Sequence, residues 1–282
     1  MAAEGVTIGT MLRAAGARID RVDARILLGH VLARPASYLV AHPEQVLAVD
    51  AAARFDALVS RRAAGEPVAY LVGAREFYGR VFAVDASVLI PRPETELVVD
   101  VAKSCFPAAP ARVLDLGAGS GALAVTLACE WPTAEVLAVD RSAAALTVAR
   151  RNAERLGARV EFVSSDWFGA LDAHWPFDLI VSNPPYIRVQ DPHLARGDVR
   201  FEPQTALVAG ADGLDDIRRI VCDAPAHLCP GGWLLLEHGY DQAADVRALL
   251  GDGPYVDIRS WRDIAGIERV TGARLDETAG RA

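Results

Sequence analysis

From residue 111 onward, short apolar runs alternate with longer amphipathic stretches, and this alternation constrains the fold more than any other feature. Strands are predicted at 112–116, 135–140, 159–165, 177–182 and 232–238, and helices at 121–130, 142–157, 215–228 and 244–251. Apolar strands separated by helices are typical of a mainly parallel, doubly wound α/β sheet. Two further strand-like runs, 255–261 and 267–275, have only a short connection, so we expect one of them to be antiparallel.

The first eighty or so residues have a different pattern, which predicts helices. The apolar residues that recur there near helical spacing are Ile19, Val22, Ile26, Leu27 and Val31. The sequence then alternates around Gly79 and ends in prolines, which predicts a β-hairpin. We therefore predict a helical domain over 1–75, a hairpin linker over 76–92 and the α/β domain over 93–282.

Composition limits the function classes that remain. With 52% hydrophobic and 23% charged residues, the chain can bury a core, and no apolar run approaches the roughly 18 residues that span a bilayer. The N-terminus lacks a secretory pattern, and the four cysteines lack metal-ligand spacing, so we expect a cytoplasmic protein without a metal. A net charge of −8 counts against a duplex DNA substrate.

A glycine-rich stretch, "VLDLGAGSGALAV", lies at the first strand-to-helix turn of the predicted sheet. Its glycines let a ligand approach the backbone closely, and the helix behind them offers N–H groups at its start. Asp140 ends the next strand, where a carboxylate can accept from ribose hydroxyls. The candidate cofactor-binding residues of this turn are Gly117, Ala118, Gly119, Ser120, Gly121 and Asp140.

Two ligands compete for this turn. Gly117, Gly119 and Ala122 also satisfy the dinucleotide pattern GxGxxG/A, which allows an NAD-binding fold. The alternative pattern, DxGxGxG, resembles motif I of S-adenosylmethionine-dependent methyltransferases. Asp115 favours the second ligand, because a carboxylate attracts a cationic sulfonium and would repel a pyrophosphate.

The tetrapeptide Asn183, Pro184, Pro185 and Tyr186 follows the strand predicted at 177–182. That strand should lie beside the first strand, so the tetrapeptide should reach the same crevice as the glycine turn. The Asn183 side-chain oxygen and the Pro184 carbonyl can accept both N–H groups of a planar amino group, while the prolines remove competing donors. Tyr186 offers a flat face for stacking.

These motifs together resemble the protein-(glutamine-N5) methyltransferases of peptide chain release factors, the HemK/PrmC family. The resemblance extends through "PVAYLVGAREFYG", "LIPRPETE", "SDWF", "SNPPYI", "GDVRFEP" and "LLLEHG". It implies a seven-stranded, mainly parallel, Rossmann-like class I methyltransferase sheet, joined through the hairpin to a small N-terminal helical domain that docks the release factor.

By the same resemblance, the substrate is the glutamine of a Gly-Gly-Gln tripeptide and the cofactor is S-adenosylmethionine. The tetrapeptide becomes the substrate clamp, with Asn183, Pro184 and Tyr186 as catalytic residues and Asn183 also beside the cofactor. Trp167 corresponds to a residue that flanks the cofactor adenine, and Asp166 to an acceptor for the adenine amino group. The sequence assigns no role to Arg92, Glu94 or Glu202.

Two other functions are compatible with part of this pattern. A DNA adenine methyltransferase shares the Asn-Pro-Pro-Tyr corner, but it needs a target-recognition region and a basic face, whereas the extra residues here form an alanine-rich helical region in a chain of net charge −8. A non-enzymatic adaptor would have no use for a corner made only of acceptors.

Overall fold

In the computed structural model, which describes residues 6–278, the chain forms two compact units. The first extends to Ala74 and includes His193–Phe201, and the second comprises Arg75–Pro192 and the chain from Glu202 onward. The segment His193–Phe201 therefore makes its contacts with the N-terminal helices, although it lies far along the sequence. The domain ranges drawn from the sequence stay a prediction.

The first unit is a small helical bundle. Its helices are α1 (Ile8–Ala15), α2 (Arg21–Leu32), α3 (Ala36–Ala41), α4 (Val49–Ala63) and α5 (Val68–Val72). The fully buried side chains at its centre include Ile8, Leu27, Leu28, Leu39 and Phe55.

The prediction of which α2 residues are buried is partly wrong. Val22 and Ile26 are exposed, at 59% and 45%, whereas Ala24, Leu27 and Leu28 are buried. The stripe through Val22 and Ile26 overlaps the stripe that begins at the small residue Ala24, and both have helical spacing. Packing against the other helices decides that the second stripe is buried.

Ion pairs and hydrogen bonds fix His193–Phe201 within the first unit. Arg62 donates to Asp23 at 2.7 Å and to Asp198 at 2.8 Å, which joins α2, α4 and the inserted segment. Arg200 donates to the carbonyl of Ala64 at 2.6 Å, just past the end of α4.

The second unit is built on a seven-stranded sheet in the order β5-β4-β3-β6-β7-β9-β8. The strands are β3 (Arg112–Leu116), β4 (Glu135–Asp140), β5 (Glu161–Ser164), β6 (Phe177–Ser182), β7 (Leu228–Glu237), β8 (Tyr255–Arg262) and β9 (Glu268–Leu275). All neighbours pair in parallel except β9, which is antiparallel to both β7 and β8. The expected doubly wound sheet with one antiparallel strand is confirmed.

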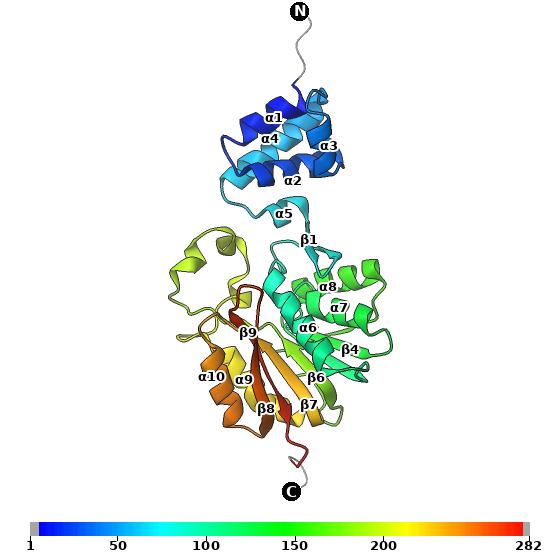
Figure 1. Cartoon of the computed structure of the whole chain (residues 1–282), viewed down its shortest axis with the longest axis vertical. Coiled ribbons are helices and arrows are strands. Elements are labelled where there is room, and N and C mark those ends of the chain that lie inside the picture. The colour runs from blue at the N-terminus through cyan, green and yellow to red at the C-terminus, as the bar shows by residue number, and fades with distance from the viewer. Residues whose placement is uncertain (1–5, 279–282) are drawn as a thin grey trace, which may run out of the picture. The chain divides into compact units, whose positions relative to one another are not determined.

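Helices cover both faces of this sheet. Figure 1 shows α6 (Glu96–Cys105), α7 (Ala122–Glu130) and α8 (Ala143–Leu156) on one side, and α9 (Asp215–Asp223) and α10 (Ala243–Gly251) on the other. Alternate side chains of β7 pack on opposite faces of the sheet. Trp233 and Leu235 belong to the cluster under α6 and α7, and Leu234 and Leu236 belong to the cluster on the other face.

A hairpin of β1 (Ala74–Phe77) and β2 (Arg80–Ala83) precedes α6, as the alternation around Gly79 predicts. Phe77 and Phe82 pack edge to face with ring centroids 6.0 Å apart, inside the cluster under α6 and α7. The buried Asn152 on α8 exchanges two hydrogen bonds with the backbone of Ala83, which fixes the hairpin to the sheet domain. In the part of the chain that the structure describes, no helix is long and apolar enough to cross a membrane.

Candidate active site

A single pocket brings the two sequence motifs together at the carboxyl ends of β3 and β6. These strands are parallel neighbours, with Leu116 opposite Ser182, so the loops that follow them emerge at the same edge. Of the predicted residues, those that line the pocket are Gly117, Ala118, Gly119, Ser120, Asp140, Asp166, Trp167, Asn183 and Pro185. Gly121, Pro184 and Tyr186 do not line it.

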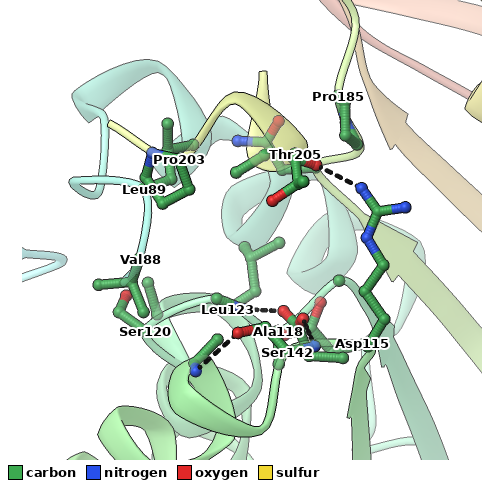
Figure 2. Close-up of a pocket in the computed structure, with 18 of the residues that line it drawn as sticks. Val88, Leu89, Asp115, Ala118, Ser120, Leu123, Ser142, Pro185, Pro203 and Thr205 are labelled. Atoms are coloured by element: carbon green, nitrogen blue, oxygen red, sulfur yellow. Dashed lines mark hydrogen bonds between the residues drawn. The ribbon is translucent and has the colours of Figure 1, made fainter. Parts of the chain in front are cut away.

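The pocket is partly open to solvent. About 970 Å³ of space free of protein atoms lies between and in front of its walls, and about 120 Å³ of it is cavity volume. Figure 2 shows Leu89 and Pro203 on one side of the opening and Pro185 across from them, with Asp115 and Ala118 at the base.

The three positions of the turn require glycine for different structural reasons. All have positive φ: 80° at Gly117, 53° at Gly119 and 81° at Gly121. A Cβ on Gly119 would meet nothing within 4 Å, so this position leaves the ligand side open. A Cβ on Gly121 would lie 3.1 Å from that of Ala149, so this glycine lets α7 pack closely on α8.

Asp140 shapes the turn as well as facing the pocket. Its Oδ2 accepts from the Gly119 N–H at 2.9 Å, and its Oδ1 accepts from the Ser142 N–H at 2.8 Å. Each carboxylate oxygen has a second lone pair, so Asp140 can still accept from ribose hydroxyls.

Asp115 is a buried carboxyl at the base of the pocket, 1% exposed. Its Oδ2 accepts from the Ala124 N–H at 3.0 Å, so one of the N–H groups at the start of α7 is already used. Among residues 6–278, Oδ1 has no hydrogen-bond partner. Desolvation by burial, partly offset by the Ala124 hydrogen bond, raises the pKa of Asp115 to about 7.

Asp166 and Trp167 lie at the edge of the pocket expected to hold the adenine. Trp167 has a φ of 52°, and its indole Nε1 donates to Asp216 at 3.1 Å. A Cβ on Gly117 would come within 3.4 Å of the indole ring, so the tryptophan packs directly on the glycine turn. Asp166 pairs with Arg219 at 2.7 Å.

The Asn183 side chain has a defined orientation. Its Nδ2 donates to the Thr95 hydroxyl at 3.0 Å. Within the described part of the chain, no hydrogen bond uses Asn183 Oδ1 or the Pro184 carbonyl, although Pro184 itself is buried. The Asn183 oxygen, in the pocket wall, therefore remains available for a ligand that brings N–H groups.

Tyr186 is fixed from several directions and lies behind the pocket. Its hydroxyl is 3.4 Å from the carboxyl of Glu237, and burial raises the pKa of that hydroxyl. Its carbonyl accepts from Gln242 Nε2 at 3.1 Å, and a Cβ on Gly213 would come within 2.3 Å of it. Gly213 therefore permits the close approach that fixes the end of the tetrapeptide.

Arg92 and Glu202, which the sequence left unassigned, form an ion pair. Glu202 also accepts from the backbone N–H of Ile90 at 3.1 Å, and its carboxyl is fully buried. The pair supports the segment that carries Pro91, Arg92 and Thr95 into the pocket wall. Glu94 is exposed.

Three polar residues around the tetrapeptide were missed by the sequence analysis. Thr95, Glu237 and Gln242 are all buried and contact Asn183 or Tyr186. Glu237 had a usable signal, because a carboxyl at the end of the apolar run "WLLLE" is costly to bury without a purpose. The sequence carried no signal for Thr95 or Gln242, because their hydrogen-bond partners come from distant parts of the chain.

The residues of the pocket fit S-adenosylmethionine. The partnerless Oδ1 of Asp115 and the carboxylate of Asp140 suit a ligand with cationic groups and ribose hydroxyls. The open side of Gly119 allows backbone contact, and Trp167 supplies an aromatic wall. The residues present therefore fit the cofactor, and the individual roles of the glycine turn, Asp115, Asp140 and Trp167 in binding it stay a prediction.

The comparisons with known proteins agree with this geometry. Residues 8–73 match a family model described as the PrmC N-terminal domain, and residues 95–197 match the methyltransferase small domain. A release factor glutamine methyltransferase of Burkholderia pseudomallei is 52% identical over 277 residues, covering 95% of this chain and 96% of the relative. Another, from Vibrio cholerae, is 47% identical over 274 residues, with 94% and 96% covered.

A solved structure shows the same fold. A Thermus thermophilus 16S rRNA methyltransferase in complex with AdoMet and guanosine is 23% identical and superimposes with a TM-score of 0.55, covering 72% of this chain and 49% of that one. Sequence identity near one half over nearly the full length shows the family. The chain is an S-adenosylmethionine-dependent enzyme that belongs to the release factor glutamine methyltransferases.

Proposed function

We propose that this enzyme methylates the side-chain amide nitrogen of the glutamine in the Gly-Gly-Gln tripeptide of peptide chain release factors. The observation that carries the proposal is the position of Asn183 in the wall of a pocket suited to S-adenosylmethionine, with its Nδ2 held by Thr95 and its oxygen without a hydrogen-bond partner among the described residues. The proposal takes the Pro184 carbonyl as the second acceptor, and a primary amide brings the two N–H donors that such a pair requires.

The chain's contribution to the reaction is positioning. An amide nitrogen is a poor nucleophile because its lone pair is delocalised into the carbonyl. Acceptors that hold both N–H groups orient the nitrogen and favour a more pyramidal, more reactive geometry. Bound S-adenosylmethionine supplies the electrophilic methyl group. The ring of Pro184 fixes φ of that residue and the following Pro185 restricts its ψ, so the Pro184 carbonyl is held in place before the substrate arrives.

The substrate class can be tested with labelled S-adenosylmethionine. The purified enzyme should label a release factor, and a matched release factor with the tripeptide glutamine changed to alanine should stay unlabelled. Duplex DNA containing adenine should also stay unlabelled, in keeping with the net charge of −8. Labelling of DNA without labelling of the release factor would contradict the proposal.

We also propose that the enzyme is cytoplasmic, because release factors, its proposed substrates, act on the ribosome.

We also propose that the N-terminal helical unit docks the release factor. Val22 and Ile26 lie one turn apart on α2 and are exposed, which gives this unit an exposed apolar surface.

Val22→Ser with Ile26→Ser should raise KM for the release factor by about 5- to 10-fold, because roughly 1 kcal/mol is lost when partly buried apolar surface leaves an interface. The KM for S-adenosylmethionine should not change. Val49→Ser, at an 87% exposed position on α4, is the matched control. Equal effects of the two changes, or no effect of the first, would contradict docking through α2.

A further inference from the structure

Thr95, Glu237 and Tyr186 lie together around one buried carboxyl, that of Glu237. Tyr186 is the last residue of the substrate clamp. Glu237 ends β7 and continues the row of Trp233 and Leu235, so its side chain turns toward the layer of α6. Thr95 lies at the start of α6, and Tyr186 follows β6, the strand next to β7. Three elements therefore converge on one carboxyl.

Glu237 is 1% exposed and Thr95 is 4% exposed. The Tyr186 hydroxyl lies 3.4 Å from Glu237 Oε1, and the Thr95 side chain lies close enough to the carboxyl to lower its pKa. Oε2 makes no hydrogen bond of normal geometry within residues 6–278. A buried carboxyl so weakly compensated costs stability, and such groups are retained where they orient something else.

The direction of the hydrogen bonds determines what the substrate meets. A carboxylate only accepts, so it requires the hydroxyls of Thr95 and Tyr186 to donate to it. Once the Thr95 proton points at Glu237, its oxygen can only accept from Asn183, as the 3.0 Å contact from Nδ2 shows. The Asn183 oxygen is then left for the substrate.

We propose that Thr95 and Glu237 are positioning residues, which act through this hydrogen-bond chain to hold the Asn183 amide with its oxygen toward the substrate nitrogen. The inference rests on the proposed function and deepens it. If Glu237 were neutral, it could donate to Thr95, and Thr95 could then donate to Asn183. The amide would be free to turn and present its NH₂ group, which a glutamine amide nitrogen cannot use.

The ionisation of Glu237 gives the inference a pH signature. Desolvation raises its pKa to about 7, hydrogen bonds from Thr95 and Tyr186 oppose this, Glu94 adds to it, and Arg269 opposes it. The neighbouring His238 has its pKa lowered by burial and is neutral in this range. Turnover should therefore increase as the pH rises through about 7.

Stability should respond in the opposite sense. Because the folded-state pKa of Glu237 lies above the ordinary value of 4.5, its contribution to stability is present at low pH and is lost as the pH rises through about 7. Glu237→Gln removes this ionisation. At pH 8 the variant should be at least as stable as the wild type, although it should turn over more slowly.

The experiment measures kcat from pH 6 to 9 at saturating S-adenosylmethionine, together with thermal unfolding at pH 8. Glu237→Gln and Thr95→Val should each lower kcat at pH 8 by about 10-fold, the size of one hydrogen bond to a charged group, with little change in cofactor KM. Both should lose the increase of kcat near pH 7. Thr95→Ser keeps the hydroxyl and should recover the turnover that Thr95→Val loses.

The outcomes separate the two proposals. A wild-type enzyme that leaves release factor unmethylated contradicts the proposed function. An active wild type with the same pH profile in Glu237→Gln contradicts the positioning role, because the buried Asp115 would then account for the increase. A Glu237→Gln variant that loses stability and keeps its kcat would show that the carboxyl is structural, as would equal losses in Thr95→Ser and Thr95→Val.

Discussion

Asn183→Ala should lower kcat for release factor methylation by about 10²-fold or more, with the dissociation constant of S-adenosylmethionine changed by only a few-fold. In the proposed function the Asn183 oxygen is one of two acceptors that orient the substrate nitrogen, and the hydrogen bond from Nδ2 to Thr95 holds the amide in place. Loss of one preorganised polar contact in an active site typically costs 10²–10³ in turnover. Single-turnover methyl transfer and equilibrium cofactor binding measure the two quantities separately.

Ser182→Ala is the matched control for this change. Ser182 is the preceding residue, is fully buried, and donates from Oγ to the Leu116 carbonyl at 2.6 Å, so its removal also breaks a hydrogen bond between β6 and β3. We expect Ser182→Ala to lower the melting temperature and to change kcat by only a few-fold. If both variants lose turnover equally, the effect of Asn183 is structural, and the acceptor argument fails.

Asp140→Ala should raise the dissociation constant of S-adenosylmethionine by about 10²-fold. The change removes the acceptor that we predict for the ribose hydroxyls, and it also frees the N–H groups of Gly119 and Ser142, whose bonds to Asp140 hold the glycine turn in shape. Two hydrogen bonds to a charged group account for about 3 kcal/mol, which corresponds to this factor. Isothermal titration with S-adenosylmethionine and with its demethylated product measures the loss directly.

Asp166→Ala provides the comparison at the other end of the pocket. Asp166 also lines it, but its side chain is 52% exposed and pairs with Arg219 at the surface. Solvent screens that interaction, so we expect the affinity to fall by less than about 10-fold. Equal losses in the two variants, or an unchanged affinity in Asp140→Ala, would show that Asp140 does not hold the cofactor.

Much of the second unit could be predicted because its strands and helices differ in period. The runs "RVLDL", "EVLAVD" and "FDLIVS" coincide with β3, β4 and β6. The short link before the final run identified an antiparallel strand, and β9 takes that place. The parallel pairing of β3 with β6 then brought the glycine turn and the Asn-Pro-Pro-Tyr corner to one edge, as the sequence predicted.

The first unit was predicted less well, and α2 shows why. Its sequence carries two overlapping apolar stripes, one through Val22 and Ile26 and one through Ala24, Leu27 and Leu28. Both fit a helical period, so the pattern alone cannot choose between them. Packing against the other helices buries the second stripe. The docking of His193–Phe201 against these helices also had no local signal, because it depends on the pairing of Arg62 with Asp198.

The sequence by itself predicted the class of fold and the chemical character of the substrate site from local pattern and spacing, and its resemblance to a family decided between the two cofactors that the glycine turn allows. Periodicity specifies strands and helices, three glycines specify a turn that side chains cannot adopt, and two prolines specify a corner with acceptors and few donors. Only the tertiary structure decided which way the Asn183 amide faces. That orientation depends on Thr95 and Glu237, which lie 88 residues before Asn183 and 51 residues after Tyr186 and meet these partners only in the folded sheet.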